Sequence, residues 1–445
     1  MNPIVIKTGG RWPRLSGGAA LSAWWALVCA GALAQVTPPI AQERPLAPVA
    51  MTGQAGTTLR QAVEAAWQRS PWARAQSARQ DALDADARVT DAWVAAPPTA
   101  SVGRLSDQPG RNAPRQEWEA ELSVPLWWPG QRDAGRTLNQ RSRAQLAAEA
   151  AAQKLAVAQA VREAWWAAVD AEEQVALWQG RVDSARALHE DVARRHRAGE
   201  LARVDAQAAS AEWLAARGEL AGAQQVLRAA RGRWQALTGI APPLLRDAEV
   251  PQAVATAGEL EADPVAGSLQ QHPALVAARL AAEAAQARID VAATAAREAP
   301  EVGVRVVRER KNATESFDNT VGVRVSVPLG TVPRTLRASA EARAEWLEAD
   351  ARQALVASRL QAEWAEAREA VQTAAQRWQL ARERAEMTAD SERLLHKAFS
   401  LGELDLATLL RARAIAFDAD RDLRRQRRAL DAAQDQLQQA LGRLP

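Results

Sequence analysis

The sequence predicts a mainly α-helical protein with a small β part, built as two copies of one structural unit. Long alanine-rich stretches carry apolar residues every three or four positions, which is the period of a helix. Two pairs of short segments alternate apolar with other residues, which is the period of a strand. Short motifs recur at an offset of 202 or 203 residues, which indicates duplication of the whole unit. The matched motifs are Ser70-Pro71 with His272-Pro273, Pro98 with Pro300, residues 123–126 with 326–329, and residues 199–201 with 402–404.

Residues 1–34 have the features of a secretory signal peptide. Three basic residues precede an apolar run at residues 19–30, and a small-x-small pattern before Gln35 marks a cleavage site. A buried helix or a membrane anchor is the alternative, but the run is shorter than the roughly 20 residues that span a bilayer. Residues 35–56 then form an N-terminal extension of the mature chain.

Charge and cysteine content exclude several classes of protein. The chain has 56 Lys and Arg against 53 Asp and Glu, a net charge of +3. That excess equals the basic residues of the signal peptide, Lys7, Arg11 and Arg14, so the mature chain is neutral and no nucleic-acid binding is expected. Cys29 is the single cysteine, which excludes disulfides and cysteine-ligated zinc. Because no small residue precedes it, a lipid anchor is not expected either.

Each predicted repeat begins with a helix that proline stops, and continues with two strands. The first repeat covers residues 57–238, the second covers residues 264–445, and a proline-rich linker at residues 239–263 joins them. The opening helices are expected at residues 59–96 and 273–298, and the strands at residues 99–106, 116–124, 302–306 and 321–327. Polar turn-rich segments between paired strands indicate exposed hairpin loops.

Beyond each strand pair, a very long helix and a return helix are predicted. The long helices are expected at residues 132–197 and 335–399, so each would be roughly 100 Å long at about 1.5 Å per residue. A glycine-containing turn follows each long helix, and the return helices are expected at residues 202–238 and 405–442. A globular core cannot enclose helices of this length.

The strands suggest an assembly of several chains. Each is long enough to cross a bilayer when tilted, and its valine row would give a barrel wall one apolar face. Four strands cannot close a barrel, and open edges are not tolerated in lipid, so several chains would share one barrel. Three copies would supply twelve strands. The alternative is a soluble helical bundle that carries two β-hairpins.

These features together resemble the outer-membrane efflux (TolC) family over essentially the whole mature chain. The resemblance rests on the repeated order of elements, the Ser-Val-Pro-Leu strand ends, and the turns at residues 195–200 and 398–404. Residues 125–132 and 328–334 resemble, more narrowly, the members that serve cobalt-zinc-cadmium cation exporters. The resemblance implies a homotrimer in the lipid of the cell outer membrane, with a 12-stranded barrel continued by an α-helical barrel across the periplasm.

The resemblance also implies partners and a function. An inner-membrane resistance-nodulation-division pump and a periplasmic adaptor (membrane fusion) protein would dock at the helical tips. The expected docking residues are Arg197, Ala198, Gly199, Glu200, Leu201, Ser400, Leu401, Gly402, Glu403 and Leu404. The channel would passively conduct substrates, heavy-metal cations among the candidates, to the exterior. A secreted or periplasmic helical scaffold without a pore is the alternative function.

Family members often narrow the periplasmic mouth with acidic side chains just past the second tip. The matching positions here are Thr408 and Arg411, with Glu403 and Asp405 nearby as substitutes, so these four residues are the candidate gate. A threefold ring repeats each charge around a narrow lumen and concentrates its field. Acidic residues also stabilise helix N-termini, and that interpretation of Glu403 and Asp405 stays open beside gating.

The sequence places three tryptophans where a membrane interface is expected and contains no recognisable catalytic pattern. Trp118, Trp127 and Trp128 fall in or just after the second strand, where interfacial aromatics anchor a barrel. No Ser-His-Asp spacing, phosphate loop or paired carboxylate site stands out, so neither enzymatic activity nor a cofactor is expected. His189 and His196 share a helix face but lie two turns, roughly 10 Å, apart, so no metal site is predicted.

Overall fold

The computed structural model describes residues 58–106, 115–241, 269–295, 298–311, 315–329 and 332–445. The predicted signal peptide, the N-terminal extension and most of the predicted linker lie outside these described ranges, as do parts of both hairpin loops. Within the described ranges, no helix combines the length and the apolar character needed to cross a membrane.

The chain forms two compact units that do not follow the order of the sequence repeats. The strand unit contains residues 97–124 and 301–326, one strand pair from each repeat. The helical unit contains the helices of both repeats. Each repeat therefore contributes to both units.

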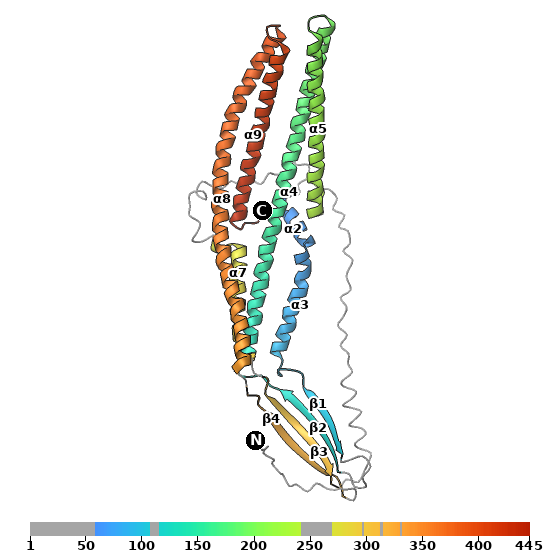
Figure 1. Ribbon diagram of the computed structural model, residues 1–445, viewed down its shortest axis with the longest axis vertical. Helices are drawn as coiled ribbons and strands as arrows, with labels where there is room; N and C mark the ends of the chain where they lie inside the picture. The colour runs from blue at the N-terminus through green and yellow to red at the C-terminus, as the bar shows by residue number, and fades with distance from the viewer. Residues whose placement is uncertain (1–57, 107–114, 242–268, 296–297, 312–314, 330–331) are drawn as a thin grey trace. The chain divides into compact units, whose positions relative to one another are not determined.

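The helical unit contains two long helices, each followed by a return helix (Figure 1). Its helices are α2 (Leu59–Arg69), α3 (Pro71–Asp91), α4 (Gln131–Arg197), α5 (Arg203–Thr238), the 3-10 turn η2 (Leu269–Gln271), α7 (Pro273–Ala295), α8 (Val332–Ser400) and α9 (Leu406–Ala440). The bounds predicted for the long and return helices agree with these within three residues. These bounds could be predicted because the helices are runs of alanine and other strong helix formers with few internal glycines and prolines.

The single helix predicted over residues 59–96 is wrong, because this segment forms two helices and ends early. Ser70 separates α2 from α3 with an extended backbone (φ −64°, ψ 142°), since the residue before a proline avoids the helical region. Its hydroxyl accepts a hydrogen bond from the Ala73 N–H at 3.1 Å and caps α3, with Pro71 in the first turn. The helix ends at Asp91 because residues from the start of α4 bind its last carbonyl groups, as described below.

Each repeat has a hydrophobic cluster of its own. In the first, α2 packs on α4 and α5, and the rings of Trp165 and Trp234 lie 5.5 Å apart. The second joins η2, α8 and α9 and contains Trp364. A buried ion pair links the repeats: Arg162 Nε lies 3.0 Å from Asp435 Oδ1, and the two side chains are only 6% and 4% exposed.

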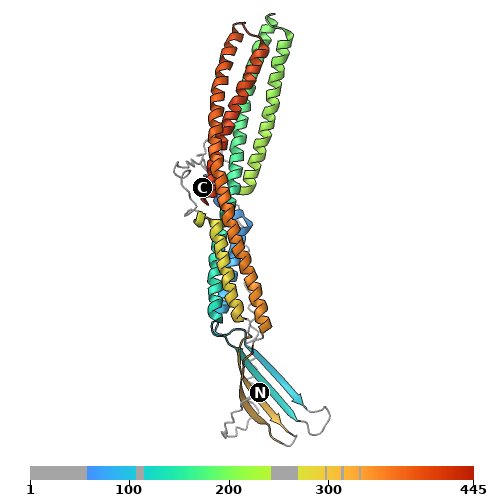
Figure 2. The ribbon, with the colours of Figure 1, turned by 60° about the vertical axis from the view of Figure 1, so that its left-hand side comes forward.

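Each long helix changes neighbours along its length. α4 packs against α3 and α7 and against its return helix α5, while α8 packs against α7 and its return helix α9 (Figure 2). α3 and α4 approach closely at Gly135, where an added Cβ would lie 2.8 Å from Thr90 Cγ2. The shorter helices thus brace the N-terminal parts of α4 and α8, and the return helices pack along their C-terminal parts up to the tips.

The strand unit is a four-stranded sheet with the order β1-β2-β3-β4. The strands are β1 (Thr99–Ser106), β2 (Gln116–Pro125), β3 (Glu301–Arg310) and β4 (Asp318–Ser326). β1 pairs with β2, and β3 with β4, as antiparallel hairpins. The predicted strand positions are confirmed, since alternation with period two is a direct signature of a half-covered strand.

Candidate functional site at the sheet and the helical tips

The sheet has one apolar face and one charged face. The apolar face of β3 and β4 consists of cross-strand valine pairs that are exposed in the single chain, namely Val302 with Val325, Val304 with Val323, and Val306 with Val321. On the other face, Glu119 Oε1 lies 2.6 Å from Arg305 Nε, and Glu121 Oε2 lies 3.0 Å from Arg324 Nη1. Successive residues of a strand point to opposite faces, so the alternation separates the two sets completely.

Gly303 makes the longer of these ion pairs possible. Glu121 belongs to β2 and Arg324 to β4, so their side chains meet across β3. A Cβ added at Gly303 would lie 3.2 Å from Glu121 Oε1 and 3.3 Å from the Leu122 carbonyl oxygen. The missing side chain thus leaves the space that the pair occupies.

This arrangement suits a wall between an apolar medium and water. Transmembrane strands alternate apolar residues toward lipid with polar residues toward an aqueous interior. The strand order leaves β1 and β4 as edges, whose outward backbone groups need further strands as partners in lipid. Further copies of the same sheet would supply them.

The tips of the two helical hairpins are built alike. Gly199 and Gly402 follow the long helices with φ of +82° and +79°, a conformation that side chains other than glycine rarely adopt. The Glu200 N–H donates to the Arg195 carbonyl oxygen at 2.9 Å, and the Glu403 N–H makes the equivalent bond at 3.0 Å. Both turns are therefore Schellman motifs, which close the last carbonyls of the helix.

A buried cluster beneath the tips joins both hairpins. It contains Leu188 and Val192 of α4, Ala209 of α5, Phe399 of α8, and Leu406 and Leu409 of α9. Leu201 and Leu404, two of the predicted docking residues, pack against it and thereby support the turns. The remaining predicted docking residues are exposed: Arg197, Ala198, Gly199, Glu200, Ser400, Leu401, Gly402 and Glu403. Val204, outside that set, is 67% exposed, close to the 65% of Leu401.

Of the candidate gate residues, Asp405 has a defined structural role. It is the N-cap of α9, where its carboxylate accepts hydrogen bonds from the Thr408 N–H at 3.1 Å and the Thr408 hydroxyl at 2.7 Å. These bonds lower the pKa of Asp405 below its ordinary value. Glu403 and Arg411 are exposed, and neither forms an ion pair with another described residue. The capping interpretation thus accounts for Asp405, and Glu403 and Arg411 are available for other contacts.

The three predicted interfacial tryptophans lie in different settings. Trp118 in β2 is 42% exposed on the apolar face of the sheet. Trp127 and Trp128 are half-buried in the helical unit, and their indole N–H groups donate to the Ala92 carbonyl at 2.9 Å and the Glu298 carbonyl at 2.8 Å. These bonds satisfy the polar ends of both rings, and the girdle role of all three tryptophans stays a prediction.

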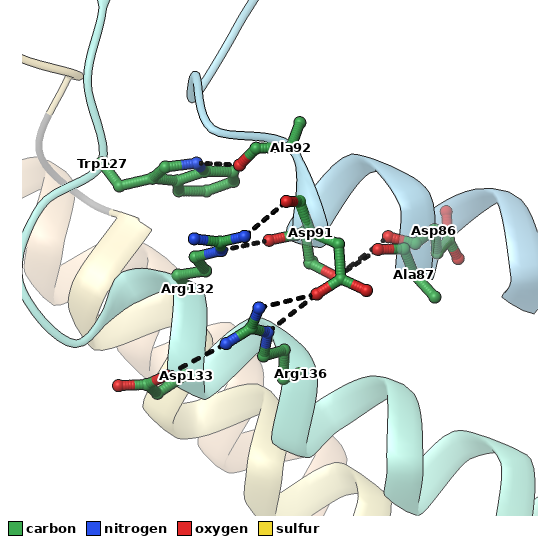
Figure 3. A network of polar contacts seen from close by, with 9 residues as sticks. Asp86, Ala87, Asp91, Ala92, Trp127, Arg132, Asp133 and Arg136 are labelled. Atoms are coloured by element: carbon green, nitrogen blue, oxygen red, sulfur yellow. Dashed lines mark hydrogen bonds and ion pairs between the residues drawn. The ribbon is translucent and has the colours of Figure 1, made fainter.

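Trp127 belongs to a polar network that ends α3 (Figure 3). Arg132 Nε donates to the Thr90 carbonyl at 3.0 Å, and a second guanidinium nitrogen of Arg132 donates to the Asp91 carbonyl. Arg136 Nε donates to Asp91 Oδ1 at 2.9 Å. Arg132 thereby satisfies two of the carbonyls that a helix C-terminus leaves open, and Arg136 binds the Asp91 carboxylate.

The histidines near the tips make structural contacts. His196 Nδ1 lies 2.9 Å from the Leu201 carbonyl oxygen, and the His189 ring stacks on Trp213 at 5.4 Å between centroids. Among the described residues, no group of three or more His, Cys, Asp and Glu side chains is placed to hold a metal ion.

The ion pairs between the repeats were not predicted from the sequence. Arg428 Nε lies 2.7 Å from Glu173 Oε2, and Asp431 Oδ2 lies 3.1 Å from Arg428 Nη1. Burial raises the pKa of Asp431, and burial followed by the charge of Glu173 raises that of Asp170. The sequence signal for such a buried ion pair is a charged residue inside an apolar helical stripe, as at Arg162.

Known proteins resemble this chain in structure but not in sequence. No protein-family model matches the chain, and no curated protein matches it in sequence. Solved structures do match. The outer membrane protein VceC of Vibrio cholerae has a TM-score of 0.66 and 17% identity, over 86% of this chain and 96% of that chain. CusC, described for its transmembrane channel formation, has a TM-score of 0.67 and 15% identity, over 90% of this chain and 98% of that chain.

The MtrE outer membrane channel of Neisseria gonorrhoeae in its open state has a TM-score of 0.65 and 15% identity, over 86% of this chain and 88% of that chain. These structures define the class of architecture. The chain has the TolC-type fold of these outer-membrane channels, as the sequence predicted.

Proposed function

We propose that the protein is the outer-membrane channel of a tripartite efflux system. Three copies close one 12-stranded barrel in the outer membrane, and the helices continue it through the periplasm as a passive conduit. The observation that carries the proposal is the two-faced sheet, exposed valines on one side and ion pairs on the other, with both edges open. The similarity of the fold to solved outer-membrane channels supports it.

The lipid-facing role of the valine face can be tested with two matched substitutions in β3. Val304 lies on the apolar face, whereas Val307 pairs with Thr320 on the charged face. Val304→Arg is expected to reduce the yield of membrane-inserted, heat-dissociable trimer, because arginine at the bilayer midplane costs about 2–4 kcal/mol. Val307→Arg is the control and should insert normally.

Channel formation is measured by single-channel conductance in planar bilayers after detergent extraction. Wild type is expected to give discrete conductance steps and to run as a trimer on unheated gels. A monomer that stays in the soluble periplasmic fraction would support the alternative, a helical scaffold without a pore, and would overturn the channel proposal.

We further propose that the exposed tip residues dock a periplasmic adaptor and, with it, an inner-membrane pump of the resistance-nodulation-division type. Leu401 and Val204 present apolar side chains at the two tips, and Glu403 presents an unpaired carboxylate. Leu401→Asp is expected to abolish efflux in cells while leaving trimer formation and conductance unchanged. Equal loss of conductance would mean that the substitution acts on the channel instead.

The gate and the substrate are proposals of the same kind. Glu403 and Arg411, with Thr408 and Asp405, are the candidate mouth residues, and Arg411→Glu is expected to raise selectivity for cations in the bilayer recording. The resemblance of residues 125–132 and 328–334 to channels of cation exporters makes heavy-metal cations the first substrates to test. Sensitivity of a deletion strain to zinc, cadmium and cobalt salts, with drugs as a comparison, measures that.

A further inference from the structure

Three arginines interrupt the apolar face of the sheet near the hairpin loops. In β3, Arg308 and Arg310 continue the row that begins with Val302, because alternate residues share a face. In β1, Arg104 stands opposite Trp118 of β2 and shares its face. Among the described strand residues, this face carries these three cations and no acidic residue.

The three arginines lie in the half of the sheet nearest the hairpin loops. The ion pairs of Glu119 with Arg305 and of Arg115 with Glu309 place the end of β3 beside the start of β2. Trp118 and Arg104 therefore lie at the level of Val306, and Arg308 and Arg310 follow one and two same-face positions nearer to the hairpin loop. Together with Phe317, these residues form a basic belt at the hairpin end of the apolar face.

Aromatic rings, rather than carboxylates, hold the arginines of the basic belt. The guanidinium carbon of Arg104 lies 5.1 Å from the Trp118 ring centroid, and those of Arg308 and Arg310 lie 4.6 Å and 4.9 Å from the Phe317 ring. None of the three forms an ion pair with another described residue, and Arg310 Nε makes no hydrogen bond. Stacking on a ring occupies one face of a guanidinium group and does not use the N–H donors that lie in its plane.

The charged face shows the contrast. There Arg305 and Arg324 each have a carboxylate partner, although water could solvate them. On the apolar face, unpaired guanidinium groups beside hydrocarbon are costly unless a counter-ion meets them. A ligand for the basic belt must therefore carry negative charge and also sit next to an apolar wall.

We infer that the basic belt binds the phosphate groups of an anionic lipid in the leaflet at the hairpin end of the sheet. Arginine matches phosphate oxygens with two parallel N–H donors, and the neighbouring valine rows take the acyl chains. This requirement for an apolar wall selects a lipid over free phosphate or an acidic protein. The inference rests on the proposed function, since it needs the valine face to lie in lipid.

The test measures lipid selectivity of the full-length protein reconstituted in phosphatidylcholine vesicles. Spin-labelled phosphatidic acid and spin-labelled phosphatidylcholine report the ratio of their association constants for the protein surface. Wild type is expected to prefer phosphatidic acid, and Arg308→Gln with Arg310→Gln is expected to lower the ratio by up to about fivefold for each arginine removed. Rising ionic strength should lower the wild-type ratio as well.

Two controls separate the basic belt from net charge and from stability. Arg337→Gln with Arg352→Gln removes the same charge from exposed pairs on α8 and should leave the ratio unchanged. Arg308→Lys with Arg310→Lys keeps the charge but loses the planar fork, so an intermediate ratio is expected. If the Gln variant does not assemble, the ratio of the Lys variant and the salt dependence of the wild-type ratio test the inference instead.

The outcomes distinguish this inference from the channel proposal. The inference alone is overturned if the protein inserts and conducts but shows no preference for phosphatidic acid. It is also overturned if the preference is unchanged by ionic strength and by substitution of Arg308. Displacement of the labelled lipid by inorganic phosphate would reassign the basic belt to a free anion. A protein that never inserts would overturn the channel proposal itself.

Discussion

Asp405 shows how one residue can carry two interpretations from sequence and one role in the structure. An acidic residue at that position suits a pore mouth and also suits a helix N-terminus. The bonds from Thr408 make Asp405 the cap of α9. Because capping accounts for its position, exposed Glu403 and Arg411 are the better places to look for charge selection.

The cap predicts a local effect and a pH dependence. Asp405→Ala is expected to fray the first turn of α9 and to speed amide exchange there, measured by hydrogen-exchange mass spectrometry. Asp405→Asn is the control, because asparagine caps as well as aspartate. Since the pKa of Asp405 is lowered in the folded state, its ionised form stabilises above the unfolded value of about 3.9, and this is lost as the pH falls through the lowered pKa. Unchanged exchange in the Ala variant would contradict the cap.

The buried pair of Arg162 and Asp435 predicts a large effect of a single substitution. Asp435 forms an ion pair with Arg162 and accepts a hydrogen bond from the Trp166 indole N–H at 3.0 Å. Asp435→Ala leaves a buried cation unpaired and is expected to lower the free energy of unfolding by about 3–5 kcal/mol. Arg337→Ala, which breaks an exposed pair on α8, should cost no more than about 1 kcal/mol. Denaturant unfolding followed by circular dichroism measures both, and equal effects would refute the argument from burial.

At the scale of elements, the tips depend on glycine conformation. Gly199→Ala and Gly402→Ala are each expected to destabilise by about 1–2 kcal/mol, because both positions have positive φ. Gly218→Ala, inside α5 with open space around it, should stabilise by up to about 1 kcal/mol. Thermal unfolding of the three variants gives the comparison, and the opposite signs are the decisive feature.

The sheet predicts a second glycine comparison. Gly303→Val is expected to separate Glu121 from Arg324 and to cost about 1–3 kcal/mol through overpacking. Gly322→Val places the same side chain in β4, where nothing lies within 4 Å, and should be tolerated. The yield of folded trimer and its dissociation temperature on gels report the difference. A tolerated Gly303→Val would show that the ion pair can move aside.

At the scale of the whole molecule, the two repeats fold as one body in the helical unit. Arg162 of the first repeat is buried against Asp435 of the second, and Glu173 binds Arg428. The cluster beneath the tips also draws on both repeats, with Val192 from one and Leu409 from the other. Each repeat has a hydrophobic cluster of its own, but part of its buried surface is completed by the other repeat.

This interlocking predicts that half of the chain is not a stable domain. Residues 57–238 expressed alone are expected to show reduced helicity and no cooperative thermal transition, because Arg162 and Trp166 lose Asp435. Coexpression with residues 264–445 as a separate chain should restore both, since the contacts between the repeats are noncovalent. Circular dichroism of the half, the pair and the full chain measures this. A cooperative transition of the isolated half would show that the repeats are independent.

The ends of the elements show how far prediction could go. The long helices were placed within three residues because alanine-rich periodicity and glycine turns are local signals. The end of α3 at Asp91 was not predicted, because it depends on hydrogen bonds from Arg132 and Trp127, which lie in another part of the sequence. Among the predicted docking residues, the inward packing of Leu201 and Leu404 likewise depends on where the two hairpins meet.

The sequence by itself determined the duplication, the order of elements and the alternation that gives the sheet two faces, because all three are written in local period and spacing. Only the tertiary structure decided which charges meet across that sheet, which tip residues face inward, and which arginines have no carboxylate partner among the described residues. Those outcomes depend on the register and packing of segments about 200 residues apart, which a local pattern does not encode.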